Sequence, residues 1–511
     1  MKKYKISSYL ITINSQGNFS LKLYQQKKGG SNFYVLDFKS KLFCIHTPYA
    51  INPELIIDNY SDLTSLLDNT FTSFVYDKKL KSLVIENSYF GLQTVYYLHK
   101  SNKVSISPLI HHLDISDKIE VDDLNLEEHL TLGYTTNQKS VFKDVDIFKK
   151  RSTYKISDNL DVKITRVIDK IKESKILFNE DLKSKLELSI ISDFENVEKP
   201  NLGITSGKDS LAILSILIQN NKAIKSSNFG NPKAQDIIIG EKISEVLDLN
   251  YRHVEFCNTE EFNFYSKQIS YFGSGLTTAS YVDMVKYVDM FLDNDESYVM
   301  GEGGECIRTF FEDKKSFDKY ITPENIIKKI FKKNNYGFFK SYFDIDDQII
   351  NEFGIDYYRE ERLTGNFSKR HSILQPYVNK VSPFLNKKFI SLAFQLDTMT
   401  LKKHPLHDYF AARNNTVNAF YNLRSENGND TQLWSKRLSI IIEKLQSLHG
   451  DFNYKKWNIT KDGVENIIKT SISNERAVYF LLRFLPLIEF LTYSGTDYYK
   501  DIEEEILHIK L

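Results

Sequence analysis

Hydrophobic and polar positions follow one pattern in the first part of the chain and a different one after it. Up to about residue 115, short runs of alternating apolar and polar residues are separated by turns rich in Asn, Lys, Ser and Gly. Alternation with a period of two is typical of β-strands. The predicted strands include FYVLDF, KLFCIH, TSFVYD, SLVIEN and TVYYLH. A helix over 122–135 and a β pair over 140–165 complete this half.

A polar stretch at 168–186 leads into a helix, and beyond it predicted strands alternate with predicted helices. The strands are 201–205, 223–229, 251–256 and 297–301, and the helices are 209–221, 234–249 and 280–294. Such alternation indicates βαβ units and a parallel sheet. From about residue 310 onward, apolar residues recur mainly at helical spacing. The sequence therefore predicts an α/β protein divided near residue 180 into domains 1–180 and 181–511.

Composition and charge narrow the class of protein. With 511 residues, of which 41% are apolar and 26% charged, the chain has the profile of a folded protein with more than one domain. Lys plus Arg and Asp plus Glu each number 67, and this zero net charge argues against a protein that mainly coats nucleic acid. No run approaches the roughly 20 apolar residues of a membrane span, and the start does not read as a signal peptide. We therefore expect a cytoplasmic protein with no nucleic-acid or membrane partner.

A short polar loop joins the first predicted strand of the second half to the helix that follows it. Its residues are Thr205, Ser206, Gly207, Lys208, Asp209 and Ser210. Small residues let the backbone approach an anion, and a helix N-terminus offers it free N–H groups. The hydroxyl groups add donors, and Asp209 is suited to hold Mg²⁺ on a bound phosphate. The loop indicates a pyrophosphate or triphosphate site, against the plainer alternative of an N-capped helix after a strand; its spacing is not that of a Walker A motif.

This loop resembles the SGGxDS pyrophosphate loop of the ATP-pyrophosphatase group, with Thr205 and Ser206 in place of the first Ser and Gly. More narrowly, the chain resembles asparagine synthetase and its relatives, the β-lactam synthetases and lasso-peptide macrolactam cyclases, over roughly residues 70–415. In the first half, 73–113 resembles the family's RDRFGxxPLYY segment and 130–156 its LLLGYxPxxxTLFxGI segment. The matching positions in the first segment are Phe90, Gly91, Tyr96 and Tyr97. The resemblance implies a degenerate Ntn-hydrolase-like αββα sandwich, then a parallel-sheet ATP-pyrophosphatase domain with a mainly helical C-terminal part.

A glycine-rich turn in the second half carries the resemblance into the catalytic site. The sequence GEGGE at 301–305 resembles the family's SGEGxDE loop, whose acidic residues face the Mg²⁺-pyrophosphate and the reacting carboxylate. The resemblance implies a catalytic role for Glu302 and Mg²⁺ ligation by Asp209 and Glu305. It also implies nucleotide contacts for Gly301, for Phe229 and for the 205–210 loop. Taken alone, two glutamates in such a turn fit a solvated loop.

Two further segments match in order. SPFLNKKFISLAFQL at 382–396 resembles the family's PFLDxxLVEFALxLP helix, and LKKHPLH at 401–407 resembles its K-x-x-L-R turn. The second match implies that Lys403 is the catalytic lysine, which would stabilise charge growing on the phosphates and on the tetrahedral intermediate. Lys402 is the competing position one residue earlier, and an ordinary surface lysine is the plainer alternative.

The N-terminal half departs from family members that hydrolyse glutamine. Those members expose a Cys directly after the initiator Met, whereas Lys2 stands here, and Cys44 lies in a strand-like run where we expect it to be buried. The NGEIYN-like glutamine segment is missing, and Asn87 and Ser88 replace the family's Arg-Asp pair. The resemblance therefore implies a glutaminase that makes no ammonia, so that the amine comes from the substrate.

The resemblance implies an enzyme that uses ATP and Mg²⁺ to adenylate a carboxylate and then captures it with an amine. β-Lactam synthetases deprotonate the amine with a Tyr–Glu pair, but those positions fall at Glu302 and Asn379. This counts against β-lactam chemistry and leaves the base unassigned, with His404 and His407 as candidates.

Three hypotheses follow for the function. The first is peptide macrolactam or other peptide-amide formation on a ribosomal or small peptide, with the amine internal or from a second substrate; the sequence leaves open whether a partner protein delivers a leader peptide. The second is amidation of a small acid, as in asparagine-like or β-lactam-like chemistry. The third is a pseudoenzyme that binds nucleotide, which the altered loop with Lys208 keeps open.

Overall fold

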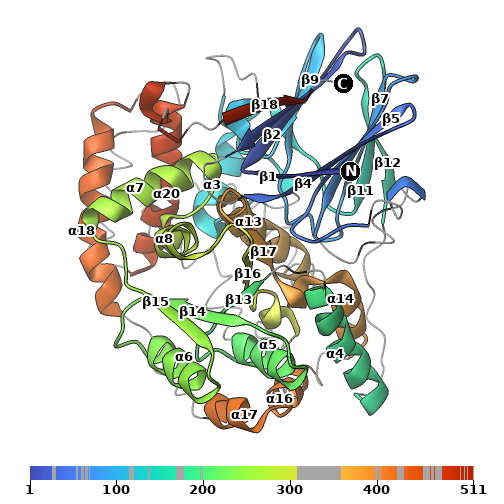
Figure 1. The fold of residues 1–511 in the computed structure, drawn as a ribbon. Coiled ribbons are helices and arrows are strands. Elements are labelled where there is room, and N and C mark those ends of the chain that lie inside the picture. The colour runs from blue at the N-terminus through green and yellow to red at the C-terminus, as the bar shows by residue number, and fades with distance from the viewer. Residues whose placement is uncertain are drawn as a thin grey trace, which may run out of the picture.

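The computed structural model describes most of the chain (Figure 1). Isolated residues and short pieces at 56–58, 63, 67, 197, 401, 461 and 465 are described as well. The continuous described ranges are 1–25, 30–52, 70–113, 120–135, 138–168, 178–195, 199–307, 358–396, 404–422, 431–452, 475–494, 496–499, 501–502 and 505–509. Within them the protein is a mixed α/β fold with three sheets, one of which is parallel.

Two antiparallel sheets form the first part of the fold. The seven-stranded sheet contains, in spatial order, β1 (Lys2–Ile6), β4 (Ser31–Phe38), β5 (Lys41–His46), β6 (Thr72–Asp77), β7 (Ser82–Asn87), β11 (Ser152–Ile156) and β12 (Val162–Val167). The six-stranded sheet contains β10 (Val145–Ile147), β8 (Tyr96–Lys100), β9 (Lys103–Ser107), β2 (Ser8–Asn14), β3 (Phe19–Gln25) and β18 (Glu505–Ile509). The five strands predicted from FYVLDF to TVYYLH are confirmed, as is the β pair within 140–165. Helix α3 (Asp123–Leu132) confirms the predicted helix and begins at Asp122, whose side chain accepts from the Asn125 N–H.

The two antiparallel sheets pack face to face through one apolar core. Alternate residues of most of these strands enter it, among them Ile11 of β2 and Phe33 of β4, both fully buried. Cys44 of β5 is 1% exposed in the same core, and burial raises the pKa of its thiol above the usual value. The expectation that Cys44 is a core residue is therefore confirmed.

The last strand of the chain returns to the first sheets. β18 pairs antiparallel with β3, so that Ile509 lies opposite Leu21 at the edge of the six-stranded sheet (Figure 1). The sequence did not predict this strand, because the region beyond residue 310 reads as helical. The C-terminal segment of predicted domain 181–511 thus completes a sheet of predicted domain 1–180.

The third sheet has five strands, all parallel, in the order β15-β14-β13-β16-β17. Its strands are β13 (Pro200–Gly203), β14 (Lys225–Phe229), β15 (Asn250–Val254), β16 (Ser297–Val299) and β17 (Asn379–Val381). The chain builds outward from β13 to β15 and then returns to the other side of β13 with β16. The strand order therefore reverses between β13 and β16, and the predicted parallel sheet is confirmed.

Helices surround this parallel sheet (Figure 1). Those between its strands are α5 (Lys208–Gln219), α6 (Gln235–Val246), α7 (Thr259–Phe272), η3 (Ala279–Tyr281), α8 (Val282–Phe291), η4 (Gly304–Ile307), the π-helical η5 (Tyr358–Phe367) and α13 (Ser368–Leu374). Preceding it is α4 (Glu180–Glu195), and following it are η6 (Pro383–Leu385), α14 (Lys387–Ala393), α16 (Pro405–Ala411), α17 (Asn415–Asn422), α18 (Thr431–His449), α20 (Glu475–Tyr493) and η7 (Asp497–Tyr499). In the part of the chain that the structure describes, none of the helices has the length and apolar character to cross a membrane.

Candidate active site at the parallel-sheet switch point

Two loops meet where the strand order of the parallel sheet reverses. Parallel strands end at the same edge of a sheet, so the 205–210 loop after β13 and the 301–304 loop after β16 leave it side by side. Gly301 and Gly304 pack directly against Asp209: a Cβ on Gly301 would lie 2.7 Å from the Asp209 Cβ, and one on Gly304 would overlap the Asp209 carboxyl group. Only glycine permits this approach at either position. Two of the motifs singled out in the sequence are thus in contact.

Hydrogen bonds within the 205–210 loop fix its shape. The Ser210 hydroxyl accepts from the Thr205 N–H at 3.1 Å, and the Thr205 hydroxyl accepts from the Gly207 N–H at 3.0 Å. Gly207 is the N-cap of α5, and no side chain caps the helix there. The hydroxyls that the sequence suggested as ligand donors therefore hold the loop, and the N-terminal turn of α5 is the part suited to an anion.

A second carboxylate, which the sequence did not predict, borders the same loop. Asp236, in the first turn of α6, accepts from the backbone N–H of Ser206 at 2.9 Å and from its hydroxyl group. The sequence signal that could have identified Asp236 is weak, since it is only an aspartate in the first turn of the helix that follows β14. Acidic residues are common there because they favour the helix N-terminus. Asp236 ties Ser206 to the neighbouring βα unit.

His407 contacts the Asp209 side chain from the protein interior. Its Nε2 atom lies 2.7 Å from Asp209 Oδ1, an arrangement that suits an Nε2–H donor. The His407 side chain is fully buried, because α16 packs on α5, whereas Asp209 is 21% exposed. His407 therefore contacts Asp209 on a side away from solvent, and its role as the base for a substrate amine stays a prediction. His404 is the N-cap of α16, in a left-handed conformation with φ of 57°.

Lys208, the unusual residue of the 205–210 loop, has partners of its own. Its Nζ lies 5.1 Å from the centroid of the Tyr421 ring and 4.0 Å from Asp408 Oδ1. Tyr421 in turn donates a hydrogen bond to Asp408 Oδ1 at 2.6 Å. The lysine is therefore accommodated by α16 and α17.

Glu302 lies in a buried ion cluster. Its Oε1 contacts Arg370 Nη1, its Oε2 contacts Lys380 Nζ, and the Ser382 hydroxyl donates to Oε2 at 3.1 Å. Burial opposes ionisation of Glu302, but the charges of Lys380 and Arg370 outweigh it and lower the pKa to about 2. Glu302 thus anchors the 301–304 loop to α13 and β17, and its ionised carboxylate is a poor base at neutral pH.

The remaining predicted residues are placed only in part. Phe229 ends β14 at the same sheet edge, with its ring stacked on Tyr287 at a centroid distance of 6.4 Å. Glu305 has its backbone in η4, but its side chain lies outside the described residues. Lys402 and Lys403 both lie outside the described residues, so their positions relative to Asp209 stay predictions.

The residues at this edge are compatible with Mg²⁺ bound together with a nucleotide. Among the described residues, no group of three or more His, Cys, Asp or Glu side chains is placed to hold a metal. Mg²⁺ usually binds through one or two carboxylates together with substrate phosphates and water. The partly exposed carboxylate of Asp209, at a helix N-terminus and in contact with the glycine-rich 301–304 loop, fits that arrangement.

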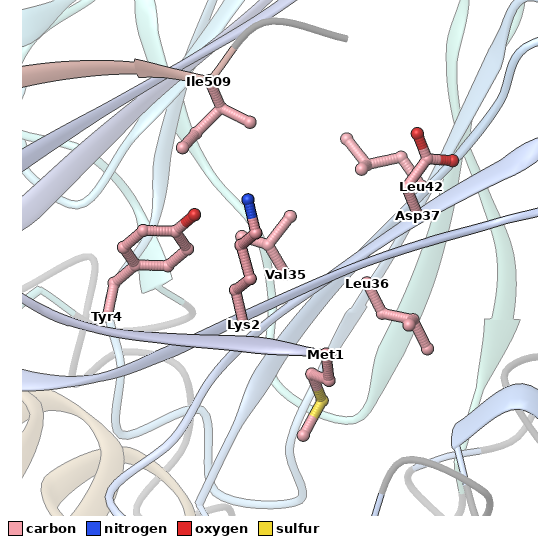
Figure 2. Close-up of a pocket in the computed structure, with 8 residues that line it drawn as sticks. All are labelled: Met1, Lys2, Tyr4, Val35, Leu36, Asp37, Leu42 and Ile509. Atoms are coloured by element: carbon pink, nitrogen blue, oxygen red, sulfur yellow. The ribbon is translucent and has the colours of Figure 1, made fainter.

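A pocket of about 350 Å³ lies in a different part of the molecule, at one end of the antiparallel sandwich. Figure 2 shows Ile509 of β18 across from Lys2 and Tyr4 of β1. Its other lining residues are Met1, Val35, Leu36, Asp37 and Leu42. None of the residues predicted for the active site lines it.

No protein-family model matches the chain, and no curated protein matches it. Function is therefore inferred from the residues at the switch point and from their chemistry.

Proposed function

We propose that this protein is an ATP-dependent, AMP-forming amide synthetase. The observation that carries the proposal is the meeting of the 205–210 and 301–304 loops around Asp209 at the switch between β13 and β16. Open parallel sheets bind ligands at this point, outside the carboxyl ends of their strands. The N-terminus of α5 favours an anion there, and glycines let a phosphate chain approach the backbone.

The proposal extends to the domains. The antiparallel sandwich would be an Ntn-hydrolase-like αββα domain over 1–180, and the parallel sheet with its helices an ATP-pyrophosphatase domain over 181–511. Cys44 and Cys257 are both buried, which disfavours either as a glutaminase nucleophile. The amine would therefore come from the substrate, most simply a peptide that forms a macrolactam or another natural-product amide.

In the proposed reaction, the 205–210 loop and the first turn of α5 hold the β- and γ-phosphates of ATP. Mg²⁺, when bound by Asp209 and Glu305, neutralises phosphate charge. A substrate carboxylate oxygen attacks the α-phosphorus, and the bond to pyrophosphate breaks. The amine nitrogen then attacks the acyl carbon, loses a proton and displaces AMP. Lys403 would stabilise the negative charge that develops in both steps.

Product analysis tests this proposal directly. Purified protein is incubated with Mg²⁺-ATP and either small carboxylic acids or peptide fractions from its own cells, and the nucleotides are identified by mass spectrometry. We expect AMP and pyrophosphate only when a carboxylate is present. Turnover with peptides but not with small acids would favour the peptide ligase, and the reverse would favour small-acid amidation. Formation of ADP would overturn the mechanism, and nucleotide binding without turnover in any fraction would favour the pseudoenzyme.

Replacement of Lys403 by alanine is expected to slow amide formation by several hundredfold, because one preorganised charge contact is lost in the transition state. ATP binding should change little. The matched control is Lys402→Ala, at the neighbouring position in the same turn. A large loss in Lys402→Ala with normal rates in Lys403→Ala would shift the catalytic assignment by one residue.

His407 supplies a test of how Asp209 is oriented. We expect His407→Leu to weaken Mg²⁺-dependent binding of ATP by about 10- to 100-fold, the range typical for loss of a partner behind a metal ligand. His407→Gln can still donate an N–H from nearly the same position and should recover most of the affinity. Equal losses in the two variants would mean that His407 acts through packing alone. Binding is measured by equilibrium dialysis of ATP with and without Mg²⁺.

A further inference from the structure

Beside the 301–304 loop, one buried and one partly exposed cation share a single buried carboxylate. One carboxylate oxygen of Glu302 forms an ion pair with Arg370 of α13, and the other forms an ion pair with Lys380 of β17. The exposed fractions of the three side chains are 3% for Glu302, 20% for Arg370 and 1% for Lys380. Buried charges are costly unless each is paired, so the ratio of two cations to one anion calls for an explanation.

Among the described residues, the histidine beside the cluster does not balance this charge. His371 is buried beside the cluster, and burial together with Lys380 holds the pKa of its imidazole well below the usual value, so it is neutral. Burial also lowers the pKa of Lys380 to about 8, because the attraction of Glu302 is offset by Arg370. Within the part of the chain that the structure describes, the cluster of Glu302, Arg370 and Lys380 thus carries a net charge of +1.

Arg370 is the member of the cluster that reaches the surface. Its guanidinium lies over the ring of Tyr281, 4.8 Å from the centroid, and its Nη2 donates to the Tyr281 hydroxyl at 3.3 Å. Its Nε atom is buried, and among the described residues the Nε–H has no hydrogen-bond partner. An arginine held on two sides, with a positive charge that no second carboxylate among the described residues matches, is suited to bind a carboxylate or phosphoryl group through the N–H donors along the edge of its guanidinium plane.

The cluster also lies next to the proposed reaction site. Glu302 follows Gly301, which packs on Asp209, so the same short loop joins Arg370 to the pyrophosphate loop. We propose that Arg370, supported by Lys380, forms an oxyanion subsite in which a carboxylate or phosphoryl group of the bound ligand supplies the second negative charge. The identity of the ligand rests on the proposed function: it is either the substrate carboxylate or the α-phosphate of ATP.

The test compares Arg370→Gln with a matched control, Arg413→Gln. Arg413 pairs with Glu187 at 3.0 Å and is 39% exposed, so the control removes an ion-paired arginine elsewhere. Arg370→Gln leaves Glu302 paired with Lys380 and should fold, which circular dichroism verifies. Thermal stability is measured in sodium sulfate against sodium chloride at equal ionic strength, and then with AMP and with sodium propionate as probes. We expect sulfate to stabilise the wild type and Arg413→Gln, and the apparent affinity to fall at least tenfold in Arg370→Gln.

The probes separate the two sources of the anion. A tenfold loss of AMP affinity in Arg370→Gln would identify the α-phosphate, and a loss confined to propionate would identify the substrate carboxylate. If sulfate, AMP and propionate act equally on Arg370→Gln and the wild type, the subsite is refuted. If the wild type binds no nucleotide at all but its response to sulfate still requires Arg370, the subsite stands and the proposed function fails.

Discussion

Replacement of Asp209 by alanine is expected to reduce ATP turnover by roughly a thousandfold or more while the protein stays folded. Asp209 lies between the two loops of the switch point, at the N-terminus of α5, with its carboxylate oriented by His407. Loss of a single preorganised electrostatic contact lowers the rate by a factor of roughly 10²–10³. Loss of a group that is also a proposed Mg²⁺ ligand should lower the rate further. The cost in stability should be about 1 kcal/mol, the scale of a charge at a helix terminus.

Turnover is measured as AMP release with a fixed carboxylate, and folding by circular dichroism and thermal denaturation. The control is Asp181→Ala, which removes an aspartate from the first turn of α4, where it pairs with Lys185 at 2.6 Å on an exposed face. Wild-type turnover in Asp209→Ala would remove Asp209 from the mechanism. A similar loss in both variants would show that the assay reports on stability.

Most of the parallel sheet could be predicted because a strand and the helix after it show a recognisable pattern over a short stretch of sequence. NLGIT followed by an apolar helix gives β13 and α5, and β14 with α6 repeats the pattern. β17 was not predicted, because NKV mixes polar and apolar residues and lies in the region that reads as helical. Helix α7 was missed although Asn258 and Glu261 form a capping box, because the segment after β15 mixes polar and aromatic residues. β18 is part of a sheet only through its pairing with β3, which lies near the other end of the chain.

The candidate site was predictable to the extent that it is built from contiguous loops. The 205–210 and 301–305 motifs are each short, and parallel topology brings their strands together, so their contact follows from the fold. The partners of Glu302 do not follow, because Arg370 and Lys380 come from a distant helix and strand, and no spacing in the sequence links them. The buried ion cluster around Glu302 could therefore not be predicted from the sequence, and the catalytic role of Glu302 stays a prediction.

Replacement of Glu302 by glutamine is expected to destabilise the protein by about 3–5 kcal/mol, because one buried and one partly exposed cation lose their shared anion. A pKa of about 2 against the usual 4.5 corresponds to about 3 kcal/mol in favour of the ionised, folded form. Since the folded-state pKa lies below the unfolded one, this contribution is present at neutral pH and is lost as the pH falls from about 4.5 towards 2. The gap in unfolding free energy between wild type and Glu302→Gln should therefore narrow over that range.

A double-mutant cycle with Lys380→Met separates charge from packing. If the cost of Glu302→Gln comes from uncompensated charge, Lys380→Met alone should be neutral or stabilising, since it leaves Arg370 and Glu302 balanced. The double variant should then be more stable than Glu302→Gln, because the remaining cation, Arg370, is partly exposed and can be hydrated. Additive losses measured by urea denaturation would instead mean that Glu302 and Lys380 contribute independently through packing. Because the same excess charge is what an oxyanion would neutralise, a gain in stability in Lys380→Met should be accompanied by weaker sulfate binding.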